Sequence, residues 1–139
     1  MLRAFAPSGP PVYFLYAEVL NSFFRVYKVV KMINFEIYKN GRIIRYEENS
    51  QLFNKEKPNP LIIFHGLYGR GKNWQSFAKK MSEHENTTIV TVDLRNHGDN
   101  IFKKSMSYTL MMEDIIDLFN YLKIKKTNLL GHSMGGKLA

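Results

Sequence analysis

The chain has 139 residues, of which 45% are hydrophobic and 14% aromatic; this suffices for one folded domain and excludes an intrinsically disordered chain. The absence of cysteine excludes disulfides, a thiolate nucleophile and cysteine-based metal sites. The formal net charge is +8, but the lysines occur in scattered pairs without interleaved aromatic residues, so we expect a solvated surface and no nucleic-acid partner. The four histidines lack metal-binding spacing, and we expect no metal or cofactor.

Residues 1–31 form a basic N-terminal extension with two open interpretations. The segment could be a targeting sequence, because it has four basic residues and one acid, but it is poor in serine and contains two adjacent prolines. Alternatively, translation starts at Met32, where a strand pattern begins at once. The apolar stretch from Val12 to Leu20 is too short to span a bilayer, so we expect no stable membrane insertion. We expect a cytoplasmic protein, with a mitochondrial location as the alternative.

Residues 32–139 have the pattern of the N-terminal part of one α/β domain. Apolar residues alternate from Ile33 to Ile37, and Asn40-Gly41 separates this run from a second one at 42–46, which predicts a tight antiparallel hairpin. The polar, proline-containing stretch at 47–59 predicts a loop.

Three buried strands should follow the hairpin. Residues 61–64, 88–92 and 128–130 are short apolar runs, of the kind found in strands buried on both faces. Helical spacing of apolar residues follows the first run, and Ser107 can cap a second amphipathic helix before the third. We therefore expect an α/β fold with a mostly parallel, right-handed sheet and an N-terminal antiparallel hairpin.

The sequence Gly-His-Ser-Met-Gly at 131–135 lies between the third strand and the start of a helix. This is the setting of a nucleophile elbow, in which the two glycines leave room for a strained turn that exposes a serine hydroxyl above the sheet. Ser133 is the candidate nucleophile, and the backbone N–H of Met134 is a candidate donor to an oxyanion.

His65, Gly66 and Leu67 come directly after the first buried strand, where hydrolases of this type have their second oxyanion donor. The backbone N–H of Leu67 would be that donor. In open α/β sheets, ligands bind at the carboxyl ends of the strands. We therefore expect Leu67, Tyr68 and Met134 to line the substrate pocket.

Four ordered motifs carry a family resemblance. They lie at residues 64–69, 91–99, 106–108 and 131–137. Through them, residues 32–139 resemble the abhydrolase group of the α/β-hydrolase family, which includes small bacterial esterases and mitochondrial α/β-hydrolase domain-containing proteins. The resemblance implies that Ser133 hydrolyses small-molecule acyl esters, or thioesters, through an acyl-serine intermediate. It also implies that Asp93 and Arg95 brace a loop.

The resemblance places the acid and the histidine of the triad after the nucleophile, and this chain has neither there. The last six residues look like the first turn of a helix without a capping residue, so we expect a hydrolase domain truncated after the elbow and inactive as printed. None of the four histidines is expected to act as the general base, because their positions in loops or beside the serine give poor access to its hydroxyl.

Two other functions stay open. Gly66 to Lys72 follows a buried strand and resembles a phosphate-binding P-loop, although Asn73 stands where that motif needs a Ser or Thr hydroxyl for Mg²⁺. The chain could also be a non-catalytic fragment that exposes the edge of an unfinished sheet. The sequence leaves the acyl-chain length and the oligomeric state open.

Overall fold

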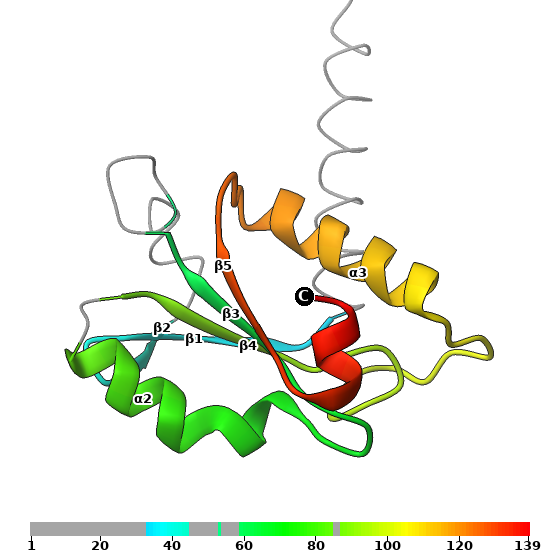
Figure 1. The fold of residues 1–139 in the computed structure, drawn as a ribbon, viewed down its shortest axis with the longest axis horizontal. Helices are drawn as coiled ribbons and strands as arrows, with labels where there is room; N and C mark the ends of the chain where they lie inside the picture. Colours follow the sequence, from blue (N-terminus) through cyan, green and yellow to red (C-terminus); the bar gives the residue numbers. More distant parts are fainter. Residues whose placement is uncertain (1–32, 45–52, 54–58, 85–86) are drawn as a thin grey trace, which may run out of the picture.

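A computed structural model describes residues 33–44, 53, 59–84 and 87–139 of the chain (Figure 1). These residues form one five-stranded sheet with helices on both of its faces. The extension at 1–31 and most of the polar stretch at 47–59 lie outside the described residues, so the interpretations of these two segments stay predictions.

The N-terminal hairpin consists of β1 (Phe35–Lys39) and β2 (Arg42–Ile44), which pair antiparallel. Lys39 lies opposite Arg42, so only Asn40 and Gly41 form the turn. Their φ angles are 49° and 72°, and two successive positive φ values are what the right-handed twist of a two-residue hairpin requires. The predicted hairpin is confirmed.

The remaining strands are β3 (Leu61–Phe64), β4 (Ile89–Val92) and β5 (Asn128–Gly131). The sheet order is β2-β1-β4-β3-β5; β3 is parallel to both β4 and β5, whereas β1 runs antiparallel to β4. This is the expected mixed sheet with an antiparallel hairpin at one side. Within the described residues β5 pairs with β3 alone and forms the other edge of the sheet.

The helices divide the core into two layers. The short 3₁₀ helix η1 (Gly71–Trp74) leads into α2 (Gln75–His84), which packs against Ile63 and Ile89 on one face. On the opposite face, α3 (Tyr108–Tyr121) buries one apolar stripe against the sheet (Figure 1). The stripe consists of Met111, Ile115, Leu118 and Leu122. Both faces of β3 and β4 are therefore covered, which explains their continuous apolar sequences.

Ser107 caps α3, as the sequence predicts: its hydroxyl accepts a hydrogen bond from the Leu110 N–H at 3.2 Å. At the C-terminal side of β5, η2 (Ser133–Lys137) is a 3₁₀ turn. No helix of the described residues is long and apolar enough to cross a membrane.

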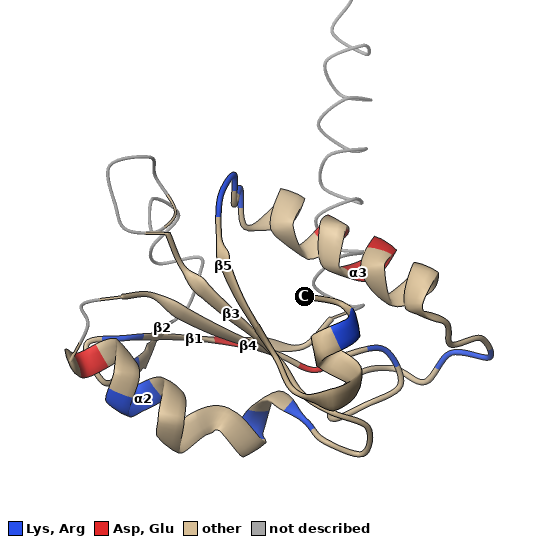
Figure 2. Cartoon of the chain, viewed as in Figure 1, with Lys and Arg blue, Asp and Glu red and all other residues tan. Residues whose placement is uncertain are grey.

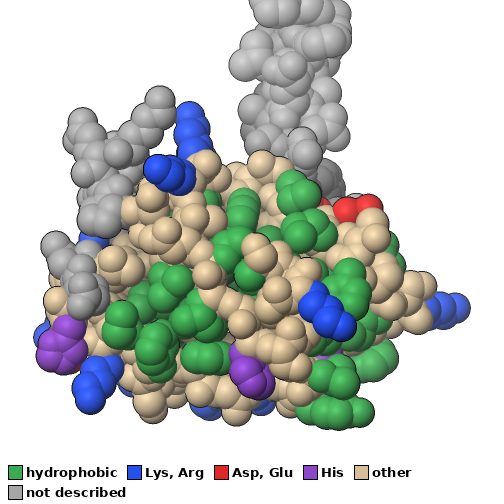
Figure 3. Space-filling model, in the orientation of Figure 1, with side chains coloured by type: hydrophobic (Ala, Val, Ile, Leu, Met, Phe, Trp, Pro, Cys, Tyr) green, Lys and Arg blue, Asp and Glu red, His purple; other side chains and the backbone are tan. Residues whose placement is uncertain are grey.

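Charged and apolar side chains are distributed differently over the surface. Figure 2 shows lysine and arginine residues spread over loops and helices around the sheet, without a continuous basic stripe. Figure 3 shows hydrophobic side chains gathered on the face that carries β5 and the C-terminal turn. Leu129 on β5 and Tyr108 on α3 are among the exposed apolar residues, with 38% and 43% of their surface accessible.

Candidate active site

Ser133 lies on a strained turn between β5 and η2. Its φ angle is 51°, in the left-handed region that non-glycine residues rarely adopt. A Cβ atom on Gly131 would lie 2.3 Å from the Gly135 carbonyl oxygen, and one on Gly135 would lie 2.4 Å from the Phe64 carbonyl oxygen. The turn can close only with glycine on both sides of Ser133, which is the geometry of a nucleophile elbow.

Residues 65–67, called the oxyanion loop after their predicted role, follow β3 and lie beside the elbow. Phe64 pairs with Gly131, and the His132 N–H donates to the Phe64 carbonyl oxygen at 3.0 Å. A Cβ atom on Gly66 would lie 3.2 Å from the Ser133 Cβ, so glycine allows the two segments to approach this closely.

Two backbone donors flank the serine without a partner among the described residues. The Leu67 N–H makes no hydrogen bond there, and Met134 occupies the second position of η2, where a helical N–H has no intrahelical acceptor. The donors come from the two segments that the sequence singled out for an oxyanion hole.

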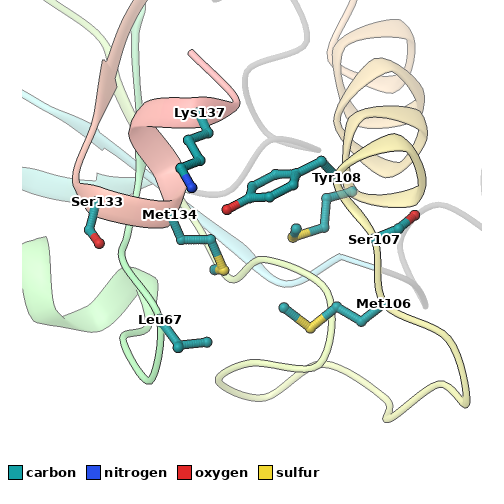
Figure 4. A pocket seen from close by; sticks show the side chains of 8 residues that line it. Leu67, Met106, Ser107, Tyr108, Ser133, Met134 and Lys137 are labelled. Atoms are coloured by element: carbon teal, nitrogen blue, oxygen red, sulfur yellow. The ribbon is translucent and has the colours of Figure 1, made fainter.

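A cavity of about 600 Å³ opens beside Ser133 (Figure 4). In Figure 4, Met134 extends toward the cavity from the elbow and Leu67 from the loop after β3, while Met106 and Tyr108 approach from the segment that leads into α3 and from its first residue. The cavity is lined by Leu67, Met106, Ser107, Tyr108, Met111, Ser133, Met134 and Lys137. Most of these side chains are apolar, so the cavity suits a hydrocarbon chain close to a polar reaction centre.

Tyr68 does not line this cavity, contrary to what its position after β3 suggested. Its φ angle is 61°, and this left-handed turn directs the side chain into solvent, where 92% of the residue is exposed. Leu67 and Met134 lie where they were expected.

His65 is a structural residue. It is 1% exposed, and its Nε2 accepts the Leu94 N–H at 2.9 Å. Nδ1 must therefore carry the proton, and it donates to the Gly66 carbonyl oxygen at 2.8 Å. Burial lowers the pKa of the imidazole, and this effect outweighs the hydrogen bond to Gly66, which raises it. With both nitrogens engaged, His65 fixes the oxyanion loop to the segment that follows β4.

The lowered pKa of His65 predicts acid sensitivity. The unfolded chain takes up a proton near pH 6.5, the ordinary histidine pKa, before the folded chain does. The stabilisation is therefore complete above this pH and is lost as the pH falls below it, by at most about 1.4 kcal/mol per pH unit. Urea unfolding at neutral and mildly acidic pH should show this slope. His65→Asn should flatten it, whereas a His84→Asn control should keep it; an unchanged slope in His65→Asn would contradict the assignment.

The other three histidines make no hydrogen bond to Ser133. The His97 Nδ1 lies 2.8 Å from the Arg95 carbonyl oxygen, and the His132 ring packs edge-on against Trp74 with 6.3 Å between ring centroids. His84 is the last residue of α2. All four histidines of the sequence are among the described residues, and none is hydrogen bonded to Ser133. The expectation that none serves as its base agrees with this geometry.

Asp93 braces the loop after β4. Its buried carboxylate accepts the Gly71 N–H at 2.6 Å, the Asp99 N–H at 2.9 Å and the Asn34 side-chain amide at 2.9 Å. The Gly71 N–H is thus bound to a carboxylate, and the Arg70 N–H donates to the Asn73 side chain. In a P-loop, backbone N–H groups of this segment would bind the phosphate instead, so this geometry argues against the nucleotide-binding alternative.

Arg95 forms a bidentate ion pair with Asp114 of α3, at 2.8 and 2.9 Å. The side chains are 9% and 5% exposed. The pair ties the loop at 93–107 to α3 and so positions the residues that line the cavity from that side. No local pattern in the sequence indicated Asp114 as the partner of Arg95, because the two residues lie nineteen positions apart.

Loss of this ion pair should destabilise the fold strongly. Asp114→Asn leaves the Arg95 guanidinium buried without a counter-charge, which typically costs about 3–5 kcal/mol. Asp117→Asn, at an exposed position of the same helix, should change the free energy of unfolding by less than about 0.5 kcal/mol. Chemical unfolding of both variants measures the difference; equal stabilities would show that the pair contributes nothing.

Five residues of the cavity were not predicted to belong to the site: Met106, Ser107, Tyr108, Met111 and Lys137. Met106 to Tyr108 and Lys137 lie in motifs of the family resemblance, Ser107 was predicted only as a helix cap, and Met111 belongs to the apolar stripe of α3. Among the described residues, no group of three or more histidine, aspartate or glutamate side chains could hold a metal ion.

Residues 59–139 match the alpha/beta hydrolase fold family. The chain belongs to this family. The match includes β3, the loop after it and the elbow, and every residue that lines the cavity lies within the matched segment.

Several characterised relatives share this part of the sequence. The chain is 39% identical over 85 residues to sn-1-specific diacylglycerol lipase ABHD11 of Danio rerio, covering 61% of this chain and 27% of the relative. It is 38% identical over 82 residues to ethanol acetyltransferase 1 of Eremothecium cymbalariae, covering 59% and 23%. The chain therefore spans about a quarter of the length of these relatives.

Solved structures of alpha/beta hydrolases have the same arrangement of elements. An esterase from a marine microorganism superposes with a TM-score of 0.61 at 33% identity, covering 78% of this chain and 34% of the esterase. The expected fold class is confirmed.

Proposed function

We propose that Ser133 is the nucleophile of a carboxylic ester hydrolase. The observation that carries this proposal is the position of Ser133: it lies on a strained elbow, at the wall of an apolar cavity, between two unpaired backbone N–H groups. Esterases and lipases among the relatives support the reaction class.

In the proposed reaction the Ser133 Oγ attacks the ester carbonyl carbon and loses its proton to a base. The N–H groups of Leu67 and Met134 donate to the resulting oxyanion, and the alcohol leaves with a proton. Water then attacks the acyl-serine and releases the carboxylic acid. Removal of one oxyanion donor typically costs about 2.7–4 kcal/mol of transition-state stabilisation.

The acyl group would occupy the cavity. Its apolar lining fits small and medium acyl chains, and a thioester would present the same carbonyl to Ser133. We therefore propose small-molecule acyl esters as the substrate class.

We further propose that an ester acylates Ser133 of this chain only slowly. A serine hydroxyl is a weak nucleophile unless a base removes its proton, and none of the four histidines is placed to do so. Binding and the oxyanion hole alone leave about 10³–10⁴-fold acceleration over water.

A chromogenic ester assay tests the proposal. The chain should release 4-nitrophenol from 4-nitrophenyl butyrate slowly and level off near one equivalent, because acylation of Ser133 without a base is slow and deacylation is slower still. It should release none from 4-nitrophenyl phosphate. No release from the ester above the uncatalysed rate, or equal release from the phosphate, would refute the proposed reaction class.

A further inference from the structure

The cavity beside Ser133 carries an unbalanced positive charge. Lys137 is the one basic residue among its described lining residues, and no aspartate or glutamate of the described chain lines it. The Lys137 Nζ lies 5.6 Å from the centre of the Tyr108 ring, and Lys137 is in none of the ion pairs of the described residues. In Figure 4, its side chain extends from η2 toward Tyr108 on the opposite wall.

The distance between Lys137 and Ser133 suits a short molecule with a functional group at each end. Lys137 follows Ser133 by four residues, and the rise of a 3₁₀ helix places their backbones roughly 8 Å apart along its axis. Met134 and Tyr108 provide apolar surface along the cavity between the two walls. A ligand with a polar carbonyl at one end, a hydrocarbon segment and an anion at the other end would match this order of groups.

We infer that Lys137 is a specificity-determining residue that selects acyl esters bearing a carboxylate. A single ammonium group neutralises one negative charge, and no described arginine lines the cavity to form the two parallel hydrogen bonds that favour a phosphate. The inference rests on the proposed function, because it takes the cavity beside Ser133 as the acyl site.

The methionines offer a readout that needs no turnover. Met106, Met111 and Met134 line the cavity, whereas Met81 and Met112 do not, so a chain labelled with methyl-¹³C methionine contains both reporters and internal controls. Monomethyl adipate and dimethyl adipate have equal chain lengths and differ in one negative charge at neutral pH.

Titration of the labelled chain with both esters tests the inference. The monoester should shift the three cavity methyl signals with about three- to fivefold higher affinity than the diester, as expected for a solvent-accessible ion pair. Lys137→Gln should remove this preference and Lys137→Arg should retain it. Lys72→Gln, at an exposed position of η1, should also retain it. The signals of Met81 and Met112 report whether each variant keeps its fold.

Equal affinities for the two esters in the parent chain, or a preference that persists in Lys137→Gln, would overturn the inference. Either outcome leaves the assignment of Ser133 untouched, since covalent acylation of that residue is measured separately. Conversely, a charge preference that depends on Lys137 would stand as a property of the cavity even if Ser133 failed to acylate.

Discussion

Ser133→Ala should abolish the slow covalent capture of acyl groups by the chain. The substitution removes the only atom proposed to form the covalent bond and leaves the cavity and both oxyanion donors in place. Water can still attack a bound ester in such a variant, so the covalent adduct is a sharper readout than turnover. Intact-protein mass spectrometry measures the adduct directly.

Ser107→Ala is the matched control for this experiment. Ser107 lines the same cavity, but its hydroxyl caps α3. Its loss should cost about 1 kcal/mol of stability and leave the adduct intact. An adduct that survives in Ser133→Ala and disappears in Ser107→Ala would show that the nucleophile is Ser107, on the opposite wall of the cavity, and would contradict the assignment.

Gly135→Ala should destroy the elbow and with it the local fold. The new methyl group would lie 2.4 Å from the Phe64 carbonyl oxygen and 2.7 Å from that of His65, and both are backbone atoms at the end of β3. Relief of this overlap requires β3 and η2 to separate. We expect a loss of more than about 4 kcal/mol, beyond the range of ordinary point substitutions.

Gly136→Ala tests whether this effect depends on position. A methyl group there would lie 3.3 Å from the nearest atom, the Gly131 carbonyl oxygen, so a small shift accommodates it. Circular dichroism and thermal unfolding of both variants should show a folded Gly136→Ala chain and a poorly folded Gly135→Ala chain. Similar melting temperatures would contradict the tight packing of the elbow against β3.

Local sequence patterns were sufficient to predict most of the described fold. Asn40-Gly41 encodes its own turn through positive φ angles, and the apolar runs of β3 and β4 reflect burial on both faces. The elbow was also predictable, because Gly131 is required by a close backbone contact with Gly135, four residues further on.

Features that depend on distant contacts escaped prediction. Asp114 looks like a surface residue of α3 until the loop after β4 brings Arg95 to it. Tyr68 was expected in the pocket because it follows the carboxyl end of β3, but its backbone is left-handed and the residue is exposed to solvent. Lys137 gained significance only when α3 was found to form the opposite wall of the cavity.

Peptide mapping after brief exposure to 4-nitrophenyl butyrate tests the central assignment most directly. The account predicts that the butyryl group resides on Ser133, at a level well above that on any lysine or on Ser107. Acylation spread over the lysines, with Ser133 unmodified, would contradict the account, because it would show that the elbow does not present a reactive hydroxyl to the cavity.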